Sequence, residues 1–322
     1  MAKKPMTVMR YRPEQTNRLY RKKHRIKVFL AIFGTIAGLI LVISSCSYMV
    51  KDIRNMTGPS DDELIVKEEQ NLYDISDTFN ILIAGVTAEN ALEYVSIVGF
   101  SPYTESVRIS TLSDLACISQ ITGEKTLGEI YAQSGLSALT EAVASIAQIE
   151  IYGTATLDFS GTTNFFDIFA GCKVYLDQNI TYITSESIMG IIAAKGTRTF
   201  SGRELVRLFS YRGWKKGEYD RTYFVSKSFA AVVDQNLSGG TPAKYTGYYS
   251  RIVNKVSTDI SATDFEDVKK YIFYLAGCNW QGDGISKIYK ILPPASEDGT
   301  ALTEGFVVSD ATLANLRAFF SQ

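Results

Sequence analysis

Few residue types in this chain could carry out acid–base, nucleophilic or metal chemistry. Its one histidine, His24, lies in a basic stretch near the N-terminal end, and Cys117, Cys172 and Cys278 are far apart and lack metal-ligand spacing. A Ser-His-Asp triad, a Cys-His pair and histidine-ligated zinc are therefore excluded from the large C-terminal region. Chemistry there has to use carboxylates, arginines, hydroxyl groups or a metal ion held by oxygen.

An uncharged, mostly apolar run over residues 28–50 follows this basic stretch. Residues 1–27 contain ten Lys or Arg and one acid, Glu14. As a helix the run would reach roughly 34 Å, enough for a hydrocarbon core of about 30 Å. Because Lys and Arg resist translocation, we predict a cytoplasmic segment 1–27, a single transmembrane helix 28–50 and an extracytoplasmic C-terminal region at the cell membrane.

Two other outcomes remain open for this segment. A cleaved secretory signal would normally have a shorter apolar core. The sequence Ile43-Ser44-Ser45-Cys46 resembles a bacterial lipobox, whose cysteine is lipidated after cleavage. The long basic segment and the apolar residues after Cys46 favour an uncleaved anchor. An anchor and a lipidated Cys46 would both keep the domain tethered outside.

The charge of the chain is divided as sharply as its hydropathy. Without residues 1–27, the chain keeps 23 basic and 33 acidic residues, a net charge of −10. Nucleic-acid binding draws on a basic surface that displaces counterions. We therefore expect no nucleic-acid partner, and the basic segment is explained by topology and anionic lipid.

The region after the apolar run alternates between strand-like and helix-like patterns. Residues 51–76 have the composition of a linker. Short β-rich runs follow at 79–86, 94–100 and 107–112, and apolar residues then recur at helical spacing over 127–146, 205–209 and 225–233. We predict a layered α/β fold with a mixed sheet, in which an α/β domain 77–240 carries a C-terminal α/β extension, 241–322, packed on it.

The order of these segments resembles the LytR-CpsA-Psr family of bacterial cell-envelope proteins. No one motif is specific, but an ordered set of matching segments extends over about 240 residues. They are the first strand Asn80-Ile81-Leu82-Ile83-Ala84-Gly85-Val86, the strand–turn–strand segment 96–112, the Lys- and Gly-containing segment 125–135, the stretch 196–212 with Phe200-Ser201-Gly202, and Glu218-Tyr219-Asp220-Arg221.

The resemblance implies a three-layer α/β/α sandwich with an apolar tunnel for a polyprenyl chain. In this family arginines grip the pyrophosphate of the lipid carrier, and acids hold a divalent cation, Mg²⁺ or Mn²⁺. Family members transfer a glycopolymer phosphate from the polyprenyl-pyrophosphate carrier to peptidoglycan. The implied partners are therefore the membrane, a polyprenyl-linked lipid carrier, and peptidoglycan or a wall glycopolymer.

The resemblance also assigns roles to individual residues. Arg212 and Arg221 match phosphate-binding arginines, whose guanidinium groups can hold phosphate oxygens bidentately. Asp220 is a third catalytic candidate. Asp114 and Lys125 are expected to contribute to substrate binding together with the two arginines. Two bland alternatives remain open: Arg212 could simply end a helix and contact its carbonyls, and Asp220 could cap a helix that begins near Arg221.

The sequence departs from the family pattern where the chemistry should be. Thr87 replaces a metal-binding Asp, and Glu93 lies near another family Asp, so these two are the candidate metal ligands. At least three phosphate-binding arginines of the family have no counterpart. Because phosphoryl transfer depends on positioning and charge neutralisation, two functions stay open: an active phosphotransferase, or a degenerate relative that binds lipid carrier, wall polymer or an envelope protein without catalysis.

Overall fold

A computed structural model describes most of the chain after the predicted linker. It covers residues 78–118, 121, 123, 125–183, 189–237, 242–280, 288–293, 301–302 and 305–321. All of them belong to the second of two structural units, Asp74–Gln322. The predicted segment 1–27, transmembrane helix 28–50 and linker 51–76 lie outside the described residues, as does Cys46. Within the described ranges, no helix combines the length and the apolar character needed to cross a membrane.

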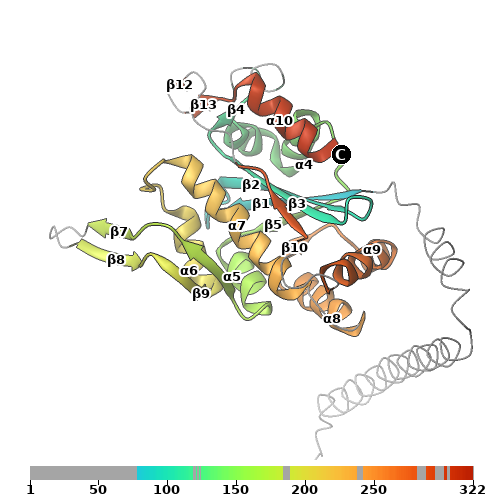
Figure 1. Ribbon diagram of the computed structural model, residues 1–322. Coiled ribbons are helices and arrows are strands. Elements are labelled where there is room, and N and C mark those ends of the chain that lie inside the picture. Colours follow the sequence, from blue (N-terminus) through green and yellow to red (C-terminus); the bar gives the residue numbers. More distant parts are fainter. Residues whose placement is uncertain are drawn as a thin grey trace, which may run out of the picture. The chain divides into compact units, whose positions relative to one another are not determined.

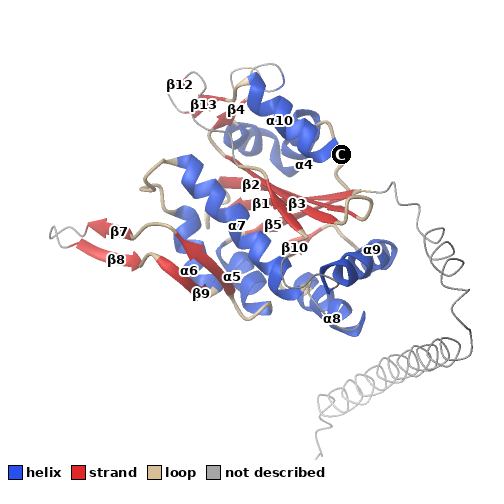
Figure 2. Ribbon diagram, in the orientation of Figure 1, coloured by secondary structure: helices blue, strands red, loops and turns tan. Residues whose placement is uncertain are grey.

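A six-stranded mixed sheet forms the centre of the structure (Figures 1 and 2). Across the sheet, the order is β10 (Ser257–Thr258), β5 (Gly153–Leu157), β1 (Phe79–Val86), β2 (Leu92–Ser101), β3 (Ser106–Ser113) and β11 (Tyr289–Ile291). Strands β1, β2 and β3 are antiparallel neighbours, whereas β5 runs parallel to β1, and β11 runs parallel to β3. The predicted α/β class with a mixed central sheet is confirmed.

Helices lie on both faces of this sheet (Figure 1). Helices α4 (Leu127–Ala147) and α10 (Asp310–Ser321) share one apolar core with Leu82 and Ala84 of β1. The other core contains Ile83 of β1 and side chains of α5 (Phe159–Ile168), α6 (Gly202–Ser210), α7 (Glu218–Asn236), α8 (Pro242–Val253) and α9 (Ala262–Trp280). Cover on both faces explains why β1 reads as a continuous apolar run and not as an alternating one.

Smaller sheets surround the central one. β4 (Ala116–Cys117), β12 (Ala301–Leu302) and β13 (Gly305–Val307) form one, while β6 (Cys172–Leu176) pairs with β9 (Gly196–Phe200), and β7 (Ile180–Ile183) pairs with β8 (Met189–Ala193). The β6–β9 ribbon leads directly into α6, so it sets the path of the chain toward Arg212.

The starts of α6 and α7 fix the segment that holds both candidate arginines. Helix α6 begins with a capping box, in which Ser201 and Glu204 each accept a hydrogen bond from the other's backbone N–H. Helix α7 begins after Gly217, whose φ of 55° favours glycine. The alternative that Asp220 caps a helix starting near Arg221 is wrong, because the helix already begins at Glu218.

Candidate functional site

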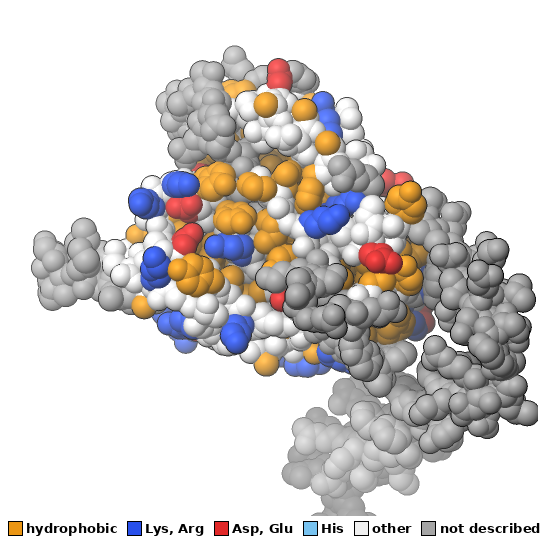
Figure 3. Space-filling model, viewed as in Figure 1, with side chains coloured by type: hydrophobic (Ala, Val, Ile, Leu, Met, Phe, Trp, Pro, Cys, Tyr) orange, Lys and Arg blue, Asp and Glu red, His pale blue; other side chains and the backbone are white. Residues whose placement is uncertain are grey.

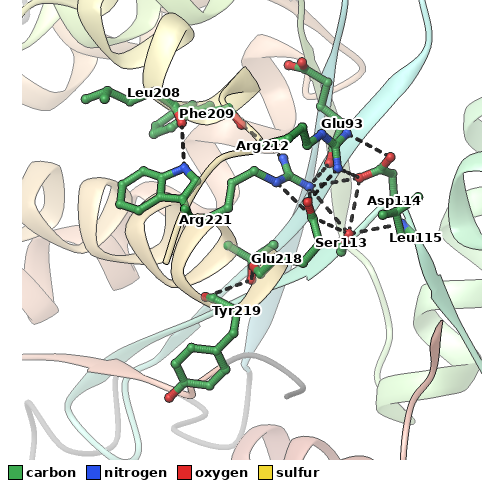
Figure 4. Close-up of polar contacts among 12 residues, drawn as sticks. Glu93, Ser113, Asp114, Leu115, Leu208, Phe209, Arg212, Glu218, Tyr219 and Arg221 are labelled. Carbon is green, nitrogen blue, oxygen red and sulfur yellow. Dashed lines mark hydrogen bonds and ion pairs between the residues drawn. The ribbon is translucent and has the colours of Figure 1, made fainter. Parts of the chain in front are cut away.

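Three separate parts of the fold bring the two predicted arginines to one place. Arg212 lies in the loop after α6, and Arg221 lies in the first turn of α7. Asp114 directly follows β3, at the end of the sheet where β1 also finishes. Figure 4 shows both guanidinium groups converging on Asp114 and on Glu218, the first residue of α7. We call these four residues the arginine cluster.

Arg221 is completely buried and has a partner on every side of its guanidinium group. Its Nη2 donates to Asp114 Oδ1 at 2.9 Å and to the Glu93 carbonyl at 2.8 Å, and its Nη1 donates to the Phe209 carbonyl at 3.1 Å. Glu218 accepts from Arg221 Nε at 2.8 Å and from Nη2. These contacts lock Arg221 between the sheet and the α6–α7 segment.

Arg212 makes a two-pronged contact with Asp114. Its Nη1 and Nη2 donate to Oδ1 and Oδ2 of Asp114, each at 3.0 Å, and Nη1 also donates to Glu218 Oε1 at 2.9 Å. Its side chain stays 43% exposed, whereas that of Arg221 is 0% exposed. The alternative that Arg212 contacts the carbonyls at the end of α6 is wrong, since its guanidinium group contacts these carboxylates.

The cluster is electrically balanced, because two guanidinium groups face two carboxylates. Burial by itself would raise the pKa of Glu218, but hydrogen bonds and charge from Arg221, a hydrogen bond from Ser113 and the charge of Arg212 lower it below its ordinary value. Burial would lower the pKa of Arg212, and Asp114 and then Glu218 raise it instead. The opposite charges therefore stabilise one another, and the cluster itself has no net positive charge left for an anion.

The surface near this end carries charges of both signs. In the space-filling view, Lys or Arg and Asp or Glu side chains are interspersed over the α6–α7 end, beside a band of hydrophobic side chains (Figure 3). Residues 195–221, which include α6 and the start of α7, contain eight Lys or Arg and three Asp or Glu. The segment around the cluster is therefore more basic than the cluster itself.

The remaining predicted site residues do not join the cluster through their side chains. Asp220 accepts a hydrogen bond from the backbone N–H of Lys216 at 2.9 Å. Lys125 donates to Gln133 Oε1 at 2.7 Å on the exposed surface of α4. Glu93 contributes its backbone carbonyl to Arg221. Their proposed roles in catalysis and substrate binding stay predictions.

The predicted metal ligands do not form a site that fits a divalent cation. The Thr87 hydroxyl accepts from the backbone N–H groups of Glu89 and Ala91, both at 3.2 Å, and so orders the β1–β2 turn. Both oxygens of Asp114 are occupied by arginine. In the part of the chain that the structure describes, no group of three or more His, Cys, Asp or Glu could hold a metal ion. We therefore derive no step through a metal.

An apolar cavity of about 250 Å³ lies between the sheet and the helices of the second core. None of its lining residues is charged, and none belongs to the arginine cluster. Its walls come from β1, β2 and β5 on one side and from α5, α7, α8 and α9 on the other; they include Phe79, Ile83, Val98, Leu157, Phe229 and Tyr248.

A series of aromatic rings in edge-to-face or tilted contact extends from the cavity toward the cluster. Phe229 lines the cavity, and its ring is 5.6 Å from Phe166, which is 5.8 Å from Phe209, which is 5.6 Å from Tyr94. The carbonyl of Phe209 accepts from Arg221. Arg221 and Phe229 are eight positions apart, which corresponds to about 12 Å along α7. We call Tyr94, Phe166 and Phe209 the aromatic wall.

Sequence reasoning did not assign a role to several residues of this region. Glu218 enters the sequence analysis only as the first residue of the segment 218–221, although its three-residue spacing from Arg221 on a helix is a known ion-pair signal. Ser113, which donates to Glu218 Oε2 at 2.7 Å, had no such signal. The aromatic wall also had none, because its three residues come from distant segments.

Comparisons with known proteins agree with this fold. The model of the LytR_cpsA_psr family matches residues 47–276. No protein with a curated description matches the chain. Among solved structures, a protein from Eubacterium siraeum described as a transcription regulator is 17% identical, with a TM-score of 0.66 over 78% of this chain and 95% of that one.

Two further solved structures carry names. B. subtilis TagV is 19% identical, with a TM-score of 0.59 over 76% of this chain and 96% of its own. TagT bound to LI-WTA is 14% identical, with a TM-score of 0.53 over 78% of this chain and 94% of its own. At these identities, the likeness to solved structures shows the fold alone.

Proposed function

The chain belongs to the LytR-CpsA-Psr family, and on that basis we propose that it is a cell-envelope protein that binds the apolar chain of a polyprenyl lipid without transferring a polymer phosphate. This is the second of the two functions left open by the sequence. It gives the apolar cavity a ligand and leaves the arginine cluster a structural role.

The balance of charge in the arginine cluster is the observation that carries this proposal. A diphosphate group is held by excess positive charge and by free N–H donors. Here Asp114 and Glu218 already accept hydrogen bonds from both Nη atoms of Arg212 and from Nε and Nη2 of Arg221. A diphosphate would have to displace two carboxylates and then lie beside them, which like-charge repulsion opposes.

The cavity supports lipid binding. Its lining consists of aliphatic and aromatic side chains with only a few hydroxyl and amide groups, as expected for a site that accepts a hydrocarbon chain. A relative of the same fold, TagT, has been seen bound to LI-WTA, a wall teichoic acid ligand. A wall polymer or its lipid-linked precursor is therefore the partner class that we propose.

The proposed location follows from the N-terminal sequence. A basic segment 1–27 followed by the apolar run 28–50 supports a single-pass anchor with the folded domain outside the cell. There, the cavity would be within reach of lipids in the same membrane. Adding a protease to intact cells tests this topology, because an outward domain is digested and an inward one is protected.

Transfer of a glycopolymer phosphate to peptidoglycan is the second candidate function. The exposed side chain of Arg212 favours it, because a ligand could reach this guanidinium group without unfolding the site. In that case Arg212 and Arg221 would bind phosphate with Asp114 and Lys125, and Asp220 would assist. The crowding of the cluster makes this the weaker proposal.

One assay separates the two candidates. The full-length chain in lipid nanodiscs is incubated with polyprenyl-pyrophosphate-linked glycan, Mg²⁺ or Mn²⁺, and peptidoglycan. We expect the lipid to be retained and no glycan to appear on peptidoglycan. Glycan transfer that is lost in Arg212→Gln, but kept in the exposed-arginine control Arg198→Gln, would overturn the non-catalytic proposal. Failure to retain any polyprenyl lipid would overturn the binding role.

A further inference from the structure

Strands β7 and β8 form a hairpin that is fixed at its base. Ile180 and Ala193 pair with each other there, are 1% and 3% exposed, and belong to the second core. The Tyr211 hydroxyl, directly after α6, donates to the Thr181 carbonyl at 2.6 Å. The base of the hairpin is therefore held beside the loop that follows α6.

The hairpin extends beyond this base as a two-stranded ribbon. β7 and β8 pair only with each other among the strands that the structure describes. Figure 1 shows both strands extending outward from the domain on the side of α6. Most of the strand residues beyond the base are apolar in the sequence, namely Tyr182, Ile183, Met189, Ile191 and Ile192. A two-stranded ribbon has no second layer that could bury such residues, so the hairpin fits a partner that supplies an apolar layer.

The chain that follows the hairpin is basic, whereas the rest of the domain is acidic. Residues 195–221 carry eight Lys or Arg and three Asp or Glu, while the other residues of 77–322 carry 12 basic and 23 acidic side chains. Five of the eight basic residues are exposed and form no ion pair within the described ranges: Lys195, Arg203, Arg207, Lys215 and Lys216. We call these five residues the α6 cations.

The three acids of residues 195–221 are engaged elsewhere. Glu204 pairs with Arg198, and Glu218 belongs to the arginine cluster. Asp220 accepts a hydrogen bond from the backbone N–H of Lys216. The positive charge of the α6 cations is therefore available to an external anion.

Backbone contacts place part of this charge at the base of the hairpin. The backbone N–H of Lys195 donates at 2.7 Å to Oδ1 of Asn179, the residue just before β7. Lys215 comes four residues after Tyr211, whose hydroxyl contacts β7. Unpaired cations therefore flank the apolar ribbon.

This combination matches the chemistry of an anionic lipid surface. At such a surface, apolar and aromatic side chains enter the interface, while Lys and Arg meet negatively charged head groups. A soluble polyanion would use the α6 cations but not the apolar ribbon. A second copy of this chain, joined through the same face, would bring like charges together. We propose that the β7–β8 hairpin and the α6 cations dock the folded domain on the anionic surface of the membrane.

This inference goes beyond the binding of a lipid chain in the cavity and does not use the cavity. Residues 51–77, between the predicted membrane helix and the first described residue, reach at most roughly 90 Å when extended. A tether of this length lets the docking face lie on the membrane that holds the predicted anchor. Docking would bring the α6 end of the domain, and the arginine cluster with it, to the lipid surface.

Hydrogen–deuterium exchange provides the first test. The full-length chain is placed, one copy per disc, in phosphatidylcholine nanodiscs that contain or lack phosphatidylglycerol. Edge amides of a two-stranded ribbon point away from the partner strand, so docking should slow their exchange. We expect phosphatidylglycerol to slow exchange in β7, β8 and α6 at least about tenfold, because each cation near an anionic surface contributes about fivefold. The distant β2–β3 turn, where Tyr103 is 71% exposed, should not change.

Three results would overturn the inference. The first is equal exchange with and without phosphatidylglycerol. The second is protection that appears only in neutral discs holding two copies, which would indicate self-association. The third is protection that requires added polyglycerol phosphate and not the lipid, which would indicate a polymer site. If prenyl lipid is still retained in any of these cases, the proposed function stands without the docking face.

Charge variants test the α6 cations separately. Arg203→Gln with Arg207→Gln should reduce the lipid-dependent protection to about twofold or less. Arg251→Gln with Lys255→Gln removes the same charge from exposed positions in and after α8 and should keep it. Equal loss in both double variants would show that only overall charge matters and would overturn the assigned face.

The apolar ribbon is tested by Ile191→Asn, with exchange followed in α6 peptides. We expect the lipid-dependent protection of α6 to fall to about twofold or less, because one isoleucine no longer leaves water. Tyr103→Asn, at the exposed β2–β3 turn, is the control and should keep the protection. Full protection in folded Ile191→Asn would exclude the ribbon from the docking face. If Ile191→Asn does not fold, exchange in the unmodified chain still decides the inference.

Discussion

Helix α7 connects two regions that differ in how completely their groups are satisfied. At its N-terminal end, Glu218 and Arg221 belong to a cluster in which the charges are paired and hydrogen-bonded. In its second half, Phe229 and Val232 line a cavity that lacks charged residues and contains unfilled space. At the N-terminal end, the protein's own side chains pair the charged groups, whereas the cavity along the second half has room for a ligand.

This difference indicates where a ligand can bind with a gain in free energy. A ligand at the arginine cluster has to replace contacts that already exist, so much of its binding energy is lost. An apolar cavity costs stability because its lining atoms lack neighbours, and a hydrocarbon chain would supply them. Family resemblance predicts both a phosphate grip and a lipid slot, but only the slot is open in this chain.

Replacing Arg221 should have the largest effect on the saturated end. Arg221→Met leaves two buried carboxylates with only Arg212 as a partner, and breaking a buried ion pair costs about 3–5 kcal/mol. Urea unfolding followed by circular dichroism measures this cost. The matched variant Arg212→Met should cost about 1 kcal/mol, because this side chain is 43% exposed and solvent screens its charge. Equal costs would show that burial does not distinguish the two arginines.

Removing the charge of Glu218 should have the next largest effect and should depend on pH. Glu218→Gln weakens hydrogen bonds to two charged groups, at a cost of about 2–3 kcal/mol at pH 7. The pKa of Glu218 is lowered in the folded state, so its stabilisation is present above its unfolded value of 4.5 and is lost as the pH falls through the folded pKa. The gap between wild type and variant should therefore close on acidification below pH 4.5.

Unfolding free energies at a series of pH values test this sign. Glu141→Gln, on the exposed surface of α4, is the control and should follow the wild type at every pH. A gap between wild type and Glu218→Gln that widens below pH 4.5 would contradict the assigned ion pairing.

Much of the frame around both regions could be predicted from sequence. Runs such as 79–86 are apolar throughout because both faces of the sheet are covered, and that pattern identifies a buried strand. The resemblance assigns both Arg212 and Arg221 to phosphate binding, and this shared role predicts that they lie close together. Local sequence patterns therefore predict the central strands, and the order of the motifs predicts the two arginines as site residues.

Whether the site residues are already paired with one another could not be predicted from the sequence, because this depends on which side chains from distant segments come into contact. Asp114 follows β3 and is about a hundred residues from the arginines that it pairs with, so no spacing rule connects them. The aromatic wall needs Tyr94 from β2, Phe166 from α5 and Phe209 from α6 in mutual contact. A sequence can supply such residues without indicating whether their rings open a passage or close it.

Filling the apolar cavity should change the free energy of unfolding less than breaking the arginine cluster does. Ala155 lines the cavity from β5, and Ala155→Phe would place a ring in existing space. We expect the free energy of unfolding to change by no more than about 1 kcal/mol, while the Kd for farnesyl phosphate rises at least tenfold. Ala155→Ser adds little volume and should keep binding. Unchanged affinity in Ala155→Phe would remove the cavity as the lipid site.

Breaking an exposed ion pair should give the smallest change in the free energy of unfolding, and this change is a reference for the variants of the arginine cluster. Arg198 pairs with Glu204 at the surface, where both side chains are about 40% exposed, and its guanidinium carbon lies 4.6 Å from the Phe200 ring centroid. Arg198→Ala should therefore cost about 0.5–1 kcal/mol. In 1 M salt, where the screening length is about 3 Å, most of the ionic part should disappear. The cost of Arg221→Met should change little in the same salt, because solvent ions do not reach a fully buried guanidinium group. If both costs fall in parallel, the cluster is open to solvent ions, and a phosphate could reach it as well.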